Sequence, residues 1–162
     1  MEIILKKNIW KLITRYNIRD TNDRDLLRIE KKLFTLSNKH VLTDLTENPL
    51  ATIKRKVFSL LPHYRVILQN GKVITIRKKP TSIKNKFTII DDEGEYTVEG
   101  DVFENNFIIK KGDEELAKVS KTIIKMFKAY DIQIKDVKNV PMIIAMIIAL
   151  DIVKYKRLAY FL

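Results

Sequence analysis

Short runs of lysine and arginine are the clearest candidates for chemistry in this sequence. They recur between residues 6 and 86, and the chain carries a formal net charge of +11. Arginine can bind a phosphate through two parallel hydrogen bonds, whereas lysine binds it as a point charge. We therefore expect a phosphate or headgroup site at Lys31, Lys32, Lys54, Arg55, Lys56, Arg77, Lys78 and Lys79. The alternative is that these cations form solvated strand edges, where lysine discourages aggregation.

Residues suited to catalysis are few. The chain has no cysteine, which excludes cysteine nucleophiles, disulfides and thiolate metal sites. Of the two histidines, His40 occupies an aromatic position of the repeat described below, and His63 follows a proline in a predicted bend. There is no nucleophile elbow, phosphate-binding glycine loop or metal-ligand spacing. We expect no enzymatic activity, no metal and no cofactor.

Two acidic clusters could suggest a calcium loop. They are DDEGE at Asp91–Glu95 and GDEE at Gly112–Glu115. Neither has the alternating acidic ligands and closing glutamate of an EF-hand. We interpret both as solvated hairpin turns.

A degenerate repeat supplies the elements that would position the basic runs. Each copy reads apolar, any, basic, any, apolar, aromatic, and a second apolar segment follows about eleven residues later. The copies start at Leu5, Ile29, Ile53, Ile76, Val98 and Val119. The segments are short, rich in β-branched and aromatic residues, and separated by turn residues such as Asn70-Gly71. Six copies of two strands predict twelve strands.

The basic third position conflicts with simple strand alternation. In an ideal strand it shares a face with the apolar first and fifth positions. Lys7, Lys31, Arg55, Lys78 and Lys121 would then point into the core, where an unpaired charge is too costly. We expect a bend or bulge that turns these side chains outward.

The apolar run MIIAMIIAL at Met142–Leu150 must leave water. Its fourfold recurrences and alanines favour a helix that is apolar on every side and therefore surrounded. At 1.5 Å per residue it covers about 14 Å, which is short of the roughly 30 Å of a bilayer. A barrel of twelve strands has a bore wide enough for a helix to fill.

These observations predict a mainly β fold. We expect a closed twelve-stranded antiparallel barrel of six repeated strand pairs around a central hydrophobic C-terminal helix. One domain would cover residues 1–162, with the barrel over 1–138, the helix over about 140–156 and an apolar tail over 157–162.

The repeat openings, the stretch YTVEGDVF at Tyr96–Phe103 and the closing helix resemble the bacterial branch of the LURP-one-related family. The resemblance implies the fold that this family shares with tubby C-terminal domains and phospholipid scramblases, a barrel around a central hydrophobic helix. It implies little chemistry, although tubby proteins bind phosphoinositide headgroups through a basic patch. Scramblases are linked to calcium-dependent lipid movement, but their calcium motif has no counterpart here.

Three functions remain open at this point. The first is a non-enzymatic cytoplasmic module that docks on anionic phospholipid headgroups at the inner membrane face, with no transmembrane span. The second is a binder of nucleic acid or another polyanion, which the net charge permits. The third is a protein-interaction module that uses the apolar tail at Lys156–Leu162.

Overall fold

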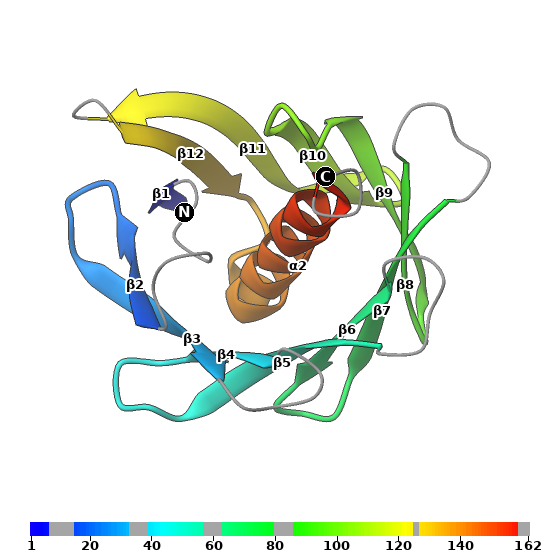
Figure 1. Ribbon diagram of the computed structural model, residues 1–162, viewed down its shortest axis with the longest axis horizontal. Coiled ribbons are helices and arrows are strands. Elements are labelled where there is room, and N and C mark those ends of the chain that lie inside the picture. Colours follow the sequence, from blue (N-terminus) through cyan, green and yellow to red (C-terminus); the bar gives the residue numbers. More distant parts are fainter. Residues whose placement is uncertain (7–14, 33–38, 57–62, 80–85, 125–126, 159–162) are drawn as a thin grey trace.

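The computed structural model describes residues 1–6, 15–32, 39–56, 63–79, 86–124 and 127–158 (Figure 1). In chain order, its elements are β1 (Glu2–Lys6), β2 (Arg15–Asp20), β3 (Asp25–Lys32), β4 (Lys39–Thr43), β5 (Pro49–Arg55), β6 (His63–Leu68), β7 (Val73–Lys78), β8 (Phe87–Asp91), β9 (Gly94–Asp101), β10 (Asn106–Lys111), β11 (Glu114–Ile124), β12 (Phe127–Ile134), η1 (Val137–Asn139) and α2 (Val140–Leu158).

Across the described residues, twelve strands form one closed barrel. Each strand pairs antiparallel with its neighbours in chain order, and β1 closes the barrel against β12, with Ile3 opposite Ile132. The six copies of the repeat are the six hairpins from β1–β2 to β11–β12. The predicted fold class, a mainly β, closed twelve-stranded antiparallel barrel, is therefore confirmed.

Strand alternation produces the core. Ile29, Ile53 and Ile76, which open successive copies of the repeat, are buried inside the barrel. The aromatic residues that open the second segments also point inward, and Tyr64, Phe87 and the others are buried apart from the half-buried Tyr16. His40 takes the same inward position and is buried.

Helix α2 runs through the middle of the barrel (Figure 1). Residues 142–153 are each at most 6% exposed, and the helix packs against β5, β6 and β7. Burial of each isoleucine or leucine contributes about 1.5–3 kcal/mol, so this run stabilises the whole barrel. The predicted central hydrophobic helix is confirmed. It begins at Val140 and ends at Leu158, and residues 159–162 of the predicted apolar tail lie outside the described residues.

The barrel has two different ends. At the turn end, short turns join the even strands to the odd strands that follow, and η1 leads there from β12 into α2. At the loop end, the odd strands finish and longer connections such as residues 33–38 and 57–62 begin. The basic runs of β3, β5 and β7 all fall at the loop end, because each follows the apolar opening of its strand.

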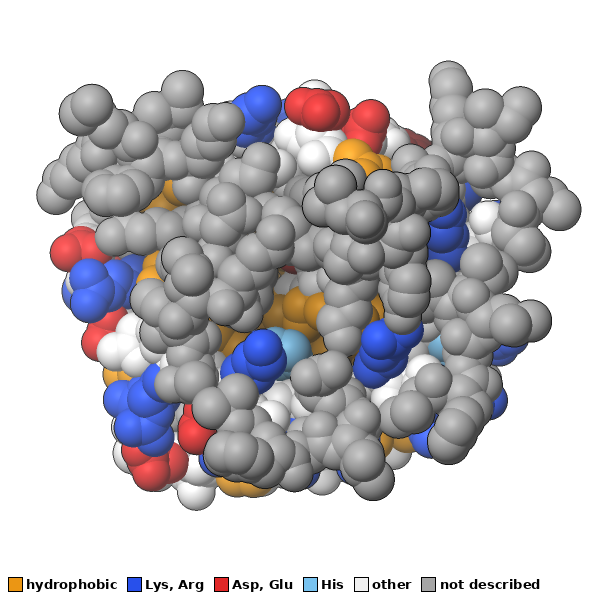
Figure 2. Space-filling view, viewed as in Figure 1, with side chains coloured by type: hydrophobic (Ala, Val, Ile, Leu, Met, Phe, Trp, Pro, Cys, Tyr) orange, Lys and Arg blue, Asp and Glu red, His pale blue; other side chains and the backbone are white. Residues whose placement is uncertain are grey.

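The predicted bulge at the basic third position is wrong for the described strands, and Lys7 lies outside the described residues. Lys31 lies opposite His40, Arg55 opposite Tyr64 and Lys78 opposite Phe87, in registers that run without a shift. These three cations share the inner face of the barrel, as ideal alternation requires, yet they are only half-buried. They avoid the core because they lie at the ends of their strands, next to the open end of the barrel. From there a long side chain can extend its charged group into solvent. On the face shown in Figure 2, Lys and Arg side chains lie on both sides of an opening with hydrophobic side chains inside it.

The segment Asp91–Glu95 forms the predicted solvated turn, except that the side chain of Asp91 is buried. The Asp91 side chain is fully buried, accepts a hydrogen bond of 2.5 Å from the Tyr96 hydroxyl and lies 3.0 Å from the Lys72 ammonium. Lys111 lies 3.6 Å from the same carboxylate and 2.7 Å from that of Glu93. This network, which we call the Asp91 network, joins three neighbouring hairpins at the turn end. No cluster of three or more metal-ligating side chains occurs among the described residues.

Candidate functional site

The outer face of β5, β6 and β7 carries a concavity of about 440 Å³, which we call the cationic groove. Cross-strand pairing assembles it: Lys54 lies opposite Arg65, which lies opposite Thr75, and His63 lies opposite Arg77. Its lining residues are Lys54, Arg55, Lys56, His63, Arg65, Ile67, Val73, Thr75 and Arg77. Directly opposed side chains on one face stand about 4.5–5.5 Å apart at Cβ, so these cations converge on one small volume.

No carboxylate lines the cationic groove in the described part of the chain. Lys54, Lys56, Arg65 and Arg77 form no ion pair with any other described residue. Like charges brought this close repel one another and destabilise the sheet. The arrangement is therefore unfavourable for folding alone and favourable for an anion.

Several arginines elsewhere on the barrel are paired with carboxylates. Arg15 and Arg28 both reach the Glu47 carboxylate, at 2.7 and 3.0 Å. Arg19 lies 2.6 Å from Asp25. The contrast with the cationic groove arises from where the acidic residues fall, since the groove strands β5, β6 and β7 contain none.

The imidazole of His63 responds to the surrounding charge. Burial lowers the pKa of His63, and the positive charges of Arg77, Lys56 and Arg65 lower it further. A bound anion would offset these charges. The histidine therefore provides a built-in reporter of occupancy.

The structure brings together half of the residues predicted from sequence. Lys54, Lys56 and Arg77 line the cationic groove from the outer face, and Arg55, which occupies an inner-face position at the end of β5, also borders it. Lys79 lies instead beside a second concavity, where it is 3.8 Å from Glu95.

The other three predicted residues occupy separate positions. Lys31 and Lys32 end β3, which β4 separates from β5, and Lys32 is 2.9 Å from Glu30. Lys78 ends β7 on the inner face of the barrel, opposite Phe87.

Sequence reasoning missed two groove residues, Arg65 and His63. Both lie in β6, which contains no basic run, so the search for such runs passed over them. The available signal was alternation: in the segment from His63 to Leu68, buried Tyr64 and Val66 place His63 and Arg65 on the outer face.

Comparison with known proteins identifies the lineage of this barrel. The sequence profile of the LURP-one-related family matches residues 1–151, which is nearly the whole chain. This chain belongs to the LURP-one-related family. The resemblance drawn from the repeat, the Tyr96–Phe103 stretch and the closing helix is thereby confirmed.

Two known proteins are similar to this chain over nearly its whole length. The uncharacterised protein YxjI of Bacillus subtilis (strain 168) is 28% identical over 155 residues, covering 96% of this chain and 94% of that protein. An X-ray structure of a protein from Arabidopsis thaliana superposes with a TM-score of 0.59 at 16% identity, covering 90% of this chain and 89% of that one. The latter similarity concerns the fold alone.

Among the described helices, none combines the length and the apolar character needed to cross a membrane. The apolar run of α2 is used inside the barrel instead.

Proposed function

We propose that this protein is a non-enzymatic binding module that docks on anionic phospholipid headgroups through the cationic groove. The observation that carries the proposal is the gathering of Lys54, Lys56, Arg65 and Arg77 around one concavity without a carboxylate among its described lining residues. On this proposal the protein acts at the inner, cytoplasmic face of a membrane and is held there peripherally. The absence of enzymatic activity is part of the same proposal.

The groove supplies the contacts that a phosphate requires. Arg65 and Arg77 each offer a planar fork for two phosphate oxygens, and the lysines add point charges. Each lysine or arginine near an anionic membrane surface contributes about 1 kcal/mol. Four such cations acting together would give measurable attachment without any inserted helix.

A lipid headgroup fits the groove better than a nucleic acid does. Sequence-tolerant binding of single strands relies on exposed aromatic rings on which bases stack. No Phe, Tyr or Trp side chain lines the described groove, and Tyr64, the ring nearest in sequence, is buried in the core. The groove instead ends toward the turn end on half-buried Ile67 and Val73, which suit the less polar part of a headgroup region.

Vesicle flotation with matched charge variants tests this proposal. The wild-type protein should float with vesicles of phosphatidylcholine and phosphatidylserine and remain unbound with phosphatidylcholine alone. The double variant Arg65→Gln/Arg77→Gln should lose about 2 kcal/mol, or roughly thirtyfold in partitioning.

Lys118→Gln/Lys138→Gln is the control, because it removes the same charge from exposed positions outside the groove. Charges farther from the docked surface than a Debye length of about 8–10 Å contribute little, so this control should retain binding. Equal loss in both double variants would assign the attraction to net charge and overturn the role of the groove. Groove-dependent binding of single-stranded DNA without vesicle binding would replace the lipid with a nucleic acid.

A further inference from the structure

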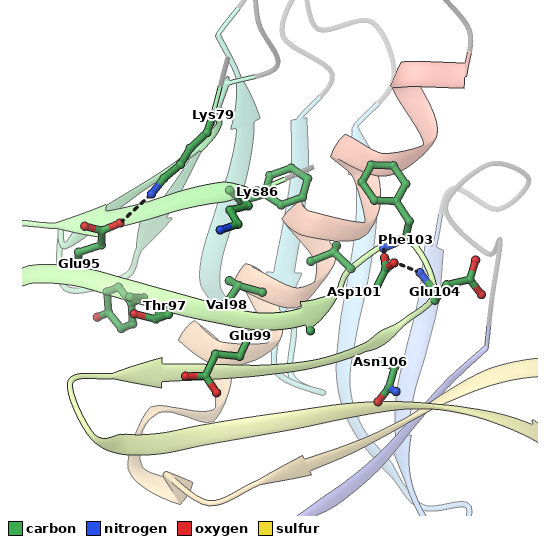
Figure 3. Close-up of a pocket in the computed structure, with 14 residues that line it drawn as sticks. Lys79, Lys86, Glu95, Thr97, Val98, Glu99, Asp101, Phe103, Glu104 and Asn106 are labelled. Atoms are coloured by element: carbon green, nitrogen blue, oxygen red, sulfur yellow. Dashed lines mark hydrogen bonds and ion pairs between the residues drawn. The ribbon is translucent and has the colours of Figure 1, made fainter. Parts of the chain in front are cut away.

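Strands β8 and β9 separate from each other toward the loop end of the barrel. These two strands pair only from the turn at Asp92-Glu93 as far as Ile89 and Tyr96. Strand β9 then continues to Asp101 while paired with β10 on its other side. We call the resulting gap the seam. It holds a concavity of about 1000 Å³, with Val98 and Thr97 of β9 on one side and Lys86 on the other (Figure 3).

Among the described residues, one hydrogen-bonding edge of β9 is unpaired along the seam. The two-residue turn makes Asp91 and Gly94 a hydrogen-bonded pair, so the next such pair is Ile89 with Tyr96. The one after that would be Phe87 with Val98. Phe87 pairs instead with Lys78 of β7 only, and no described strand pairs with the Val98 backbone on this side. An unpaired edge of this kind is a template for another strand.

The walls of the seam differ between its inner and outer faces. Inside lie apolar side chains: Phe87 is buried, Val98 and Phe103 are half-buried, and the two phenylalanine rings stack with centroids 6.3 Å apart. Outside, the seam carries more acidic than basic groups. The acidic lining residues are Glu95, Glu99, Asp101 and Glu104, and the basic ones are Lys79 and Lys86.

We propose that the seam is a docking site for an extended segment of another protein whose side chains alternate between apolar and basic. Such a segment would add a strand to β9 and hydrogen-bond with the Val98 backbone, as in β-augmentation. Its inward side chains would contact Phe87 and Phe103, and its outward cations would face Glu99 and its acidic neighbours. This proposal is independent of the cationic groove, which lies on β5–β7.

The excess of carboxylates specifies the charge of the partner. The chain has a net charge of +11, whereas the seam is lined by four carboxylates and two lysines. Three of these carboxylates already lie near a lysine of this chain: Glu99 is 2.8 Å from Lys110, Glu104 is 3.6 Å from Lys121 and Glu95 is 3.8 Å from Lys79. A partner's cations would therefore meet Asp101 directly and share the other three carboxylates with these lysines. Within a +11 protein, a strip that favours cations discriminates against acidic segments and against the anions that suit the groove.

The test uses a synthetic peptide of alternating valine and lysine. A matched peptide methylated on alternate backbone nitrogens keeps the side chains but loses the donors that face β9. The first peptide should bind in a fluorescence anisotropy titration and the methylated peptide should bind at least about tenfold more weakly. With the first peptide at about ten times its Kd, occupancy is about 90%, so hydrogen exchange at the Val98 amide should slow about tenfold.

Two protein variants complete the experiment. Val98→Pro removes the donor at the seam while leaving the bonds of Thr97 and Glu99 to β10, so it should abolish binding with the thermal midpoint nearly unchanged. Glu99→Lys should weaken the basic peptide more than Glu114→Lys does, because Glu114 is an exposed carboxylate away from the seam. Equal binding of both peptides, or unchanged exchange at Val98, would overturn the proposal. Self-association that Val98→Pro abolishes, without peptide binding, would assign the edge to a second copy and also overturn it.

Discussion

Replacing Asp91 by asparagine tests whether the Asp91 network stabilises the barrel through charge. Burial raises the pKa of Asp91, but the hydrogen bond from Tyr96 and the Lys72 ammonium outweigh it and lower the pKa to about 2. The ordinary value is 3.8. Because a tenfold change in proton affinity is worth about 1.4 kcal/mol, the difference corresponds to about 2 kcal/mol of folding free energy.

The sign of this contribution follows from the lowered pKa. The folded state holds the Asp91 proton more weakly than the unfolded state does, so ionisation favours folding. The stabilisation is complete above about pH 5 and is lost as the pH falls through 3.8 toward 2. Asp91→Asn removes this titration and retains a side chain of nearly the same shape.

At neutral pH, Asp91→Asn should destabilise the protein by about 2–3 kcal/mol. Removing one partner of a buried ion pair usually costs about 3–5 kcal/mol. The cost should be smaller here, because Glu93 remains 2.9 Å from Lys72 and 2.7 Å from Lys111. The thermal midpoint should fall by roughly 5–10 °C, since about 1 kcal/mol shifts it by about 2–4 °C in a protein of this size.

Urea unfolding between pH 2 and pH 7 provides the assay. The free-energy difference between wild type and Asp91→Asn should shrink by about 2 kcal/mol between pH 6 and pH 2. Asp92→Asn, in an exposed position of the same turn, is the control and should stay close to wild type throughout. A difference between wild type and Asp91→Asn that is constant across this range would refute the electrostatic explanation.

Three further predictions concern the core, strand β9 and the groove. Ile147→Lys should unfold the protein by circular dichroism because Ile147 is 3% exposed, whereas Ile147→Val should cost only about 1 kcal/mol. Gly100→Ala should lower the free energy of unfolding in urea by about 2–3 kcal/mol, because Gly100 has φ +101° and an added Cβ would lie 2.5 Å from a β10 carbonyl oxygen. The control Gly112→Ala should cost about 1 kcal/mol, because Gly112 has φ +59° but no atom lies within 4 Å of the added Cβ. The pKa of His63 measured by NMR should lie below 6.5 and rise in Arg77→Gln, and a value unaffected by that substitution would contradict the described field.

The barrel and its central helix were predictable from sequence because each depends on a local pattern. The repeat gave the hairpins, and the run at Met142–Leu150 gave a helix too apolar for a surface and too short for a bilayer. The bulge at Lys31 and Arg55 was a wrong inference from the same alternation. That inference assumed that every inward-facing residue is fully buried in the core, whereas Lys31 and Arg55 are half-buried at the open end of the barrel.

The cationic groove was predictable only in part. Lys54, Arg55 and Lys56 were found as a run, but their meeting with Arg65 depends on the register between β5 and β6. The sequence also could not show that Lys31 lies away from the groove. Equivalent positions of the repeat fall on different strands around the barrel, and β4 separates β3 from β5. The burial of Asp91 escaped notice for a similar reason, because its cationic partners, Lys72 and Lys111, come from neighbouring hairpins.

Titration of the isotopically labelled protein with short-chain phosphatidylserine tests the central claim most directly. The claim is that anionic headgroups bind between β5 and β7, so amide shifts should concentrate at Lys54, Arg65 and Arg77 while the pKa of His63 rises. Shifts that are absent, or that centre on strands other than β5, β6 and β7, would contradict the assignment of the cationic groove as the headgroup site.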